Sequence, residues 1–145
     1  MSRIASPALA LVALIALAGC TTPPPQLDLS LKRPSVDGRY VVTLQPPVPS
    51  PPINQLHSWQ VKLETPAGQP VAKANIAVDG GMPQHGHGLT TRPRVTREPA
   101  DGAYRLEGMK FSMTGWWEIK LAIKSAEGED TVTFNTMVPV SGAAR

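Results

Sequence analysis

Apolar and polar residues alternate along much of the chain after residue 58, and this period of two is typical of half-buried β-strands. The longest alternating run extends from Trp117 to Lys124, with charged residues between apolar ones. Shorter candidate strands occupy residues 40–44, 59–64, 74–78, 104–107 and 132–138. No window outside the first twenty residues repeats apolar residues at intervals of three and four, so a helical domain is not expected.

Turn signals separate these candidate strands at intervals of about ten residues. They are Asp37-Gly38, Pro66-Ala67-Gly68, Asp79-Gly80-Gly81, Asp101-Gly102 and Ala126-Glu127-Gly128-Glu129. The last of them joins its two flanking strands as a hairpin. The number of candidate strands and the spacing of the turns between them predict an all-β fold, an immunoglobulin-like β-sandwich of about seven strands. The single Cys excludes the internal disulfide of antibody domains, so the likeness is one of architecture.

The first twenty residues predict an export signal that ends in a lipid-attachment site. An apolar stretch of eleven residues, Ala8 to Ala18, follows a basic start at Arg3 and is too short to span a bilayer. The tetrapeptide Leu17-Ala18-Gly19-Cys20 resembles the lipobox of bacterial lipoproteins, in which the signal is cut before the Cys and its sulfur is acylated, as with palmitate. The resemblance implies a membrane anchor on Cys20. Because Thr21 follows and not Asp, it also implies the periplasmic face of the outer membrane.

Proline content sets the expected domain boundaries. Residues 21–52 hold 9 of the 16 Pro, a composition that favours extended polyproline II. We expect a signal peptide over 1–19, a lipidated Cys and Pro-rich linker over 20–36, and the β-sandwich over 37–141. If residues 40–44 form the first strand, the Pro-rich run 46–52 is a loop inside the domain. Otherwise the linker extends to about residue 52.

Two histidines in a glycine-rich segment are the strongest candidates for chemistry. His85 and His87 at i and i+2 of an extended backbone point the same way, and Gly86 and Gly88 let the backbone fold around a shared ion. Imidazole suits copper, zinc, iron and nickel, whereas thioether sulfur selects soft ions, above all Cu(I). The nearby thioether of Met82 therefore points to copper. The remaining candidate sulfur ligands are Met113 and Met109.

A purely structural role for the same residues stays open. The imidazoles can hydrogen-bond the backbone of a turn. Met109, Phe111 and Met113 are spaced two residues apart, so in a strand all three would lie on the same face, as core residues do. The third histidine, His57, is expected to be solvated. Trp116 falls on the polar face opposite Trp117, so we expect it to be an exposed contact for a partner.

Several function classes are not expected. Lys and Arg are scattered at a net charge of +3, without the runs that bind nucleic acid. Arg92, Arg94 and Arg105 fit a solvated strand face better than an anion site. The patterns His-Glu-x-x-His and Gly-x-Ser-x-Gly are absent, and three His are too few for the two-metal site of a Cu/Zn superoxide dismutase. The chain is therefore not expected to be an enzyme.

Three spaced motifs resemble the YtkA-like domain family, which is related to FixH-like proteins. They are Met82-Pro83-Gln84-His85-Gly86-His87-Gly88, Asp101-Gly102-Ala103-Tyr104 and the run from Gly108 to Glu118. The resemblance covers about residues 55 to 140 and implies a membrane-attached, extracytoplasmic β-sandwich with a link to copper or respiratory oxidase assembly. The expected function is copper binding or delivery through the Met/His loop. The alternative is a non-metal module that docks on another envelope protein.

Overall fold

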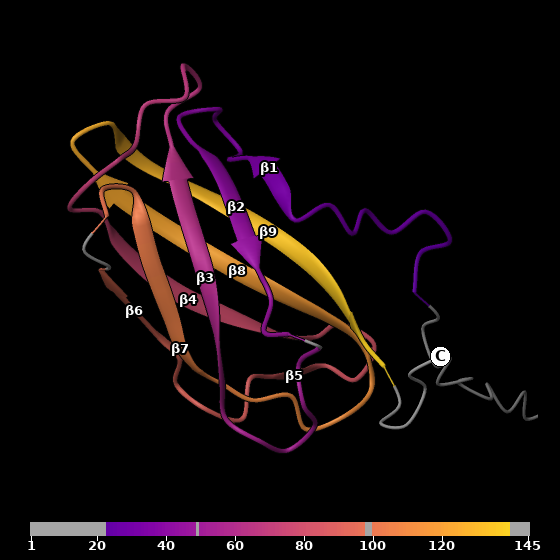
Figure 1. Ribbon diagram of the computed structural model, residues 1–145. Helices are drawn as coiled ribbons and strands as arrows, with labels where there is room; N and C mark the ends of the chain where they lie inside the picture. Colours follow the sequence, from indigo (N-terminus) through magenta and orange to yellow (C-terminus); the bar gives the residue numbers. More distant parts are fainter. Residues whose placement is uncertain (1–22, 49, 98–99, 140–145) are drawn as a thin grey trace, which may run out of the picture.

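Two antiparallel sheets face each other in the computed structural model, which describes residues 23–48, 50–97 and 100–139 (Figure 1). The first sheet has the strand order β1-β2-β3-β7-β6, with β1 (Lys32–Pro34), β2 (Val41–Gln45), β3 (His57–Glu64), β7 (Ala103–Met109) and β6 (Arg94–Arg97). The second has the order β5-β4-β8-β9, with β5 (His87–Gly88), β4 (Asn75–Met82), β8 (Gly115–Ser125) and β9 (Gly128–Val138). Within the described residues no helix is long and apolar enough to cross a membrane.

The prediction of an all-β sandwich is confirmed, and the described residues form nine strands in place of about seven. The additional strands are short, two to four residues each, and a period of two cannot be recognised over so few residues. One of them, β1, lies in the segment expected to be linker, so the sandwich begins before residue 37. Pro46 to Pro52 falls in the loop between β2 and β3, as the first of the two alternatives predicted. The signal peptide and Cys20 lie outside the described residues.

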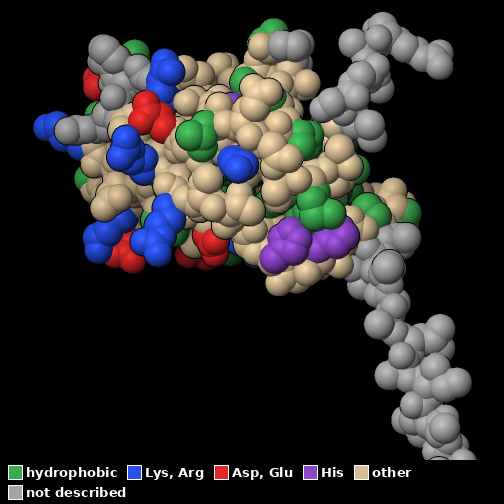
Figure 2. Space-filling view, turned by 90° about the horizontal axis from the view of Figure 1, so that it is seen from below, with side chains coloured by type: hydrophobic (Ala, Val, Ile, Leu, Met, Phe, Trp, Pro, Cys, Tyr) green, Lys and Arg blue, Asp and Glu red, His purple; other side chains and the backbone are tan. Residues whose placement is uncertain are grey.

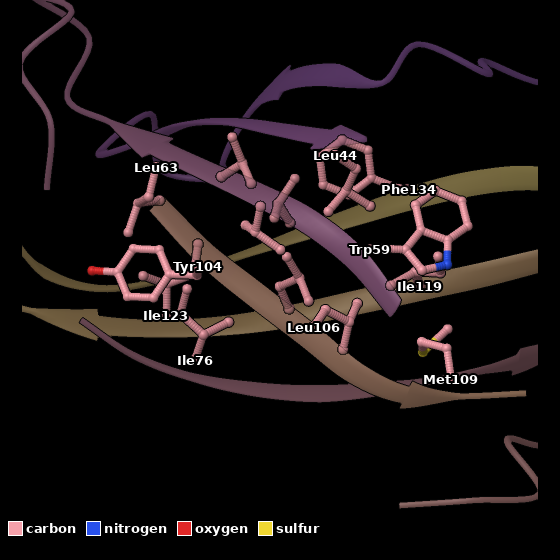
Figure 3. Packing of buried hydrophobic residues seen from close by; sticks show 14 of the residues in the cluster. Leu44, Trp59, Leu63, Ile76, Tyr104, Leu106, Met109, Ile119, Ile123 and Phe134 are labelled. Carbon is pink, nitrogen blue, oxygen red and sulfur yellow. The ribbon is translucent and has the colours of Figure 1, made fainter. Parts of the chain in front are cut away.

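The core lies between the sheets and is built from the apolar positions of the alternating strands. Side chains of β2, β3 and β7 meet those of β4, β8 and β9 (Figure 3). The largest fully buried side chains include Trp59, Trp117, Tyr40, Tyr104, Phe111 and Phe134. Burying one large apolar side chain stabilises the fold by about 1.5–3 kcal/mol, so this two-layer core accounts for most of the driving force.

Residues 28–36 run along the outer edge of β9, in the direction opposite to that strand. The Asn135 amide donates to the Asp28 carbonyl at 2.9 Å, and the Arg33 guanidinium donates to the Thr133 carbonyl at 2.8 Å. Farther along, the Val36 N–H donates to the Thr131 carbonyl at 2.9 Å. This segment covers part of an edge that would otherwise be open to strand addition.

A buried carboxylate on β9 holds the loop between β1 and β2. Asp130 accepts hydrogen bonds from the Ser35 hydroxyl at 2.6 Å and from the backbone N–H groups of Asp37, Arg39 and Thr131. Burial alone would raise the pKa of Asp130, but these hydrogen bonds stabilise the charged form and lower the pKa from 3.8 to about 2. The folded protein therefore binds this proton less tightly than the unfolded chain does.

We expect the stability of the protein to fall as the pH is lowered from about 4 towards 2. The contribution of Asp130 is complete above its unfolded pKa and is lost as the pH falls through the folded pKa, and the full loss is up to about 2 kcal/mol. Urea unfolding between pH 2 and 6 measures it. Asp130→Asn should be less stable than the wild type at pH 6, and its free energy of unfolding should depend less on pH. Asp101→Asn, at an exposed turn, should keep the wild-type stability at pH 6. An Asp130→Asn variant with the wild-type acid slope would contradict this account.

Candidate metal centre

The two candidate histidines lie on a hairpin formed by β4 and β5. Met82 pairs with His87 and Gly81 with Gly88, which leaves residues 83–86 as the turn. The N–H groups of His85 and Gly86 both donate to the Met82 carbonyl at 3.0 Å. Gly86 has a φ of +66°, in the left-handed region where glycine is strongly favoured. Because residues opposite each other on antiparallel strands point to the same face, the side chains of Met82 and His87 leave the hairpin on one side.

The turn brings the two imidazole rings together at the surface. Their centroids are 5.7 Å apart and their planes are inclined by 22°. Figure 2 shows histidine side chains on this face beside hydrophobic ones, with most of the charged side chains of the same face gathered away from them. An imidazole nitrogen binds a metal at about 2.0–2.1 Å, so two rings on one ion have centres roughly 6 Å apart. The centroid distance of the pair is close to this value.

His87 also lies against the end of the hydrophobic core. Its ring meets the edge of Trp117 with centroids 6.3 Å apart, and Trp117 in turn lies 5.0 Å from Phe111. Trp117 is fully buried, and its indole N–H donates to the Met113 carbonyl at 3.0 Å. One buried indole thus contacts the hairpin that carries His87 and fixes the backbone of the loop that carries Met113.

The candidate thioethers occupy different environments. Met82 is buried, and its methyl group lies so close to Gly115 that a Cβ added there would be 3.3 Å away. Met113 is 41% exposed, so the expectation that it fills the core is wrong for this residue. Met109 and Phe111 are fully buried core residues, as the structural alternative predicted. Met82 therefore lies on the core side of the hairpin, next to its pairing partner His87, whereas Met113 lies exposed on the loop before β8.

The expectation that His57 is solvated is wrong. The ring is half-buried against Phe111, with centroids 5.1 Å apart, because the first residue of β3 pairs with Met109 at the end of β7. Burial lowers the pKa of His57, while a hydrogen bond between Nδ1 and the Gln55 carbonyl partly opposes this. Nε2 is buried without a hydrogen-bond partner. The aromatic contacts place all three histidines at one end of the sandwich, separated by Phe111 and Trp117.

His57 does not complete a ligand set with the pair. In the part of the chain that the structure describes, no three side chains of His, Cys, Asp or Glu lie close enough to hold a metal ion. The candidate ligands are therefore the two imidazoles of the hairpin, the thioether of Met82 beside His87, and the thioether of Met113 on the loop before β8. This donor set fits a soft ion of low coordination number and does not fit the four-ligand cage of structural zinc.

Gly80 and Gly81, which the sequence indicated only as part of a turn, hold this hairpin against its neighbouring strands. A Cβ on Gly81 would lie 2.4 Å from the His87 carbonyl oxygen, and one on Gly80 would lie 2.2 Å from the Glu118 carbonyl oxygen. No side chain fits at such distances, so the close approach of β4 to β5 at Gly81 and to β8 at Gly80 depends on glycine. The same glycines, with Gly86 and Gly88, leave a hollow of about 310 Å³ beside His87, bordered by Asp79, Glu118 and Lys120.

Trp116 lies on the outer face of the second sheet, as its parity predicted. It is half-buried opposite Met137, and its indole N–H donates to the Asn135 side-chain oxygen at 2.9 Å. Because adjacent residues of a strand point to opposite faces, Trp116 points away from the core position of Trp117 and contributes no contact to the His pair. A contact between Trp116 and a partner stays a prediction.

Comparison with known proteins identifies one family. A family model described as YtkA-like matches residues 35–122. No curated protein matches the chain significantly. Among solved structures, the ZirS C-terminal domain matches 90% of this chain and 85% of its own length, at 9% sequence identity and a TM-score of 0.42. That likeness is too distant to support a functional argument.

Proposed function

The chain belongs to the YtkA-like family, and we propose that it is a lipid-anchored, extracytoplasmic β-sandwich that binds and delivers Cu(I) through its Met/His hairpin. The observation that carries this proposal is the pair of exposed imidazoles 5.7 Å apart on the β4–β5 hairpin. Two thioethers are further candidate ligands, Met82 buried beside His87 and Met113 exposed on the loop before β8. Sulfur of this kind favours Cu(I) over harder ions.

An exposed and incomplete ligand set suits transfer better than storage. His85 and His87 would provide the nitrogen ligands, Met113 would reach the ion from solvent, and Met82 would support it from the core side. A partner can then add its own ligands from the open side before the ion leaves. The proposed anchor is the acylated Cys20, which places the protein in the cell envelope, on the periplasmic face of the outer membrane.

Titration of the folded protein with Cu(I), in competition with a chelator under anaerobic conditions, tests the proposal. We expect about one Cu(I) per chain and weaker binding of Cu(II) and Zn(II). Met113→Leu should weaken Cu(I) binding by about tenfold, since one soft ligand is lost. Met137→Leu is the matched control, because Met137 is similarly exposed at 45% but lies on the outer face opposite Trp116.

A folded protein that takes up no Cu(I) would remove the copper proposal. The exposed side chain of Met137, opposite the half-buried Trp116, would then favour the second candidate, a module that docks on another envelope protein without metal.

A further inference from the structure

The chain enters the sandwich at the end that carries the histidine pair. Contacts of Asp28 with Asn135, Arg33 with Thr133 and Val36 with Thr131 show that residues 28–36 run from the carboxyl end of β9 towards its start. Asn135 pairs with Glu118, and Glu118 pairs with Gly81, one residue before Met82. Asp28 therefore lies at the level of the β4–β5 hairpin, and the residues before it lead away past that end.

The inference rests on the proposed lipid anchor at Cys20. With that anchor, the point where the chain enters the sandwich limits the distance between the domain and the bilayer. Eight residue steps separate Cys20 from Asp28, and a fully extended chain spans about 28 Å over that number. A strand as long as β8, with 11 residues, is about 36 Å long. An anchored domain thus keeps Asp28, and with it the histidine end, within about 28 Å of the lipid-bearing Cys20, which is less than the length of the sandwich.

The loops at this end have the surface that a bilayer attracts. Val48 is 94% exposed, Leu56 is exposed beside β3, and Met113 is exposed before β8. In Figure 1 the β2–β3 and β7–β8 connections lie with β5 at one end of the sandwich. The connecting segments 46–56, 83–86, 89–93 and 110–114 contain no Asp or Glu. Their charged residues are Arg92 and Lys110, which favour an anionic lipid surface.

We propose that the loop tips with Val48 and Leu56 contact the surface of the bilayer that holds Cys20. Apolar side chains at such tips enter the boundary between headgroups and acyl chains, and the two cations pair with lipid phosphates. The His85–His87 pair then faces the membrane. A metal ion on the pair would be offered to proteins in that membrane and not to the open compartment.

Reporter dyes at two exposed valines test this orientation. The full-length chain, isolated from membranes, is reconstituted into vesicles of phosphatidylcholine and phosphatidylglycerol with an environment-sensitive dye on Val48→Cys. Val36→Cys is the matched control, because Val36 is 78% exposed on the loop at the opposite end. We expect brominated lipids to quench the dye at residue 48 at least threefold more than the dye at residue 36. The mass of the isolated protein reports whether Cys20 carries lipid.

The quenching tests the orientation of the domain, and the mass tests the anchor. Equal quenching at the two positions of a lipidated protein overturns the proposed orientation and leaves the copper proposal untouched. An unmodified Cys20 overturns the anchor and the orientation together. If the dye at residue 48 becomes protected only when native membrane proteins are added, this end docks on a protein, and contact with lipid is refuted.

Discussion

Replacing both hairpin histidines with alanine is expected to lower Cu(I) affinity by at least about 100-fold, a loss of roughly 3 kcal/mol or more. The rings of His85 and His87 are the only nitrogen ligands at the proposed site among the described residues, and their removal leaves thioethers alone. The measurement is the same anaerobic competition with a Cu(I) chelator. Both side chains are exposed, so the unfolding free energy should change by less than about 0.5 kcal/mol.

The third histidine provides the control for this experiment. His57 lies at the same end of the sandwich but is separated from the pair by Phe111 and Trp117. His57→Gln should therefore bind Cu(I) like the wild type, even if the half-buried site makes the variant somewhat less stable. A double variant that keeps wild-type affinity, or a His57→Gln variant that loses it, would place the metal elsewhere.

The strands that carry the fold could be predicted because their alternation extends over five or more residues. Trp59 to Glu64 and Trp117 to Ser125 show inward apolar and outward polar positions, and the structure buries them accordingly. The short strands β1, β5 and β6 are defined by their partners and not by a pattern of their own. Pairing of Lys32–Pro34 with β2 depends on a contact that only the assembled sandwich provides.

The candidate site depends in part on local sequence and in part on contacts between distant strands. An extended backbone predicts that His85 and His87 point the same way, but His85 lies in the turn and His87 on β5, so the hairpin turn brings the two rings together. The contact of His87 with Trp117 depends on the register of β4 with β8, and the burial of His57 depends on the register of β3 with β7. Register is fixed by long-range packing, which one sequence does not display. Met113 lies in the loop before β8, where the alternation of a strand no longer determines which side chains are buried. Its exposure therefore could not be predicted from the sequence pattern.

Trp117 is the residue through which the core and the proposed site are coupled, and Trp117→Ala should destabilise the protein by about 3–5 kcal/mol. The indole is fully buried, packs 5.0 Å from Phe111 and binds the Met113 carbonyl. The adjacent Trp116 is the matched control. It is half-buried on the outer face, so Trp116→Ala should cost about 1 kcal/mol. Urea unfolding at neutral pH distinguishes the two.

A milder substitution separates packing from positioning. Trp117→Phe keeps an aromatic ring in the core but removes the N–H that holds the Met113 backbone, so the loop before β8 should loosen while the sandwich stays folded. We then expect Cu(I) affinity to fall by about threefold to tenfold in Trp117→Phe, and Met113→Leu to cost less in that background than in the wild type. Additive losses would show that Met113 acts independently of the indole, and the proposed coupling between core and hairpin would fail.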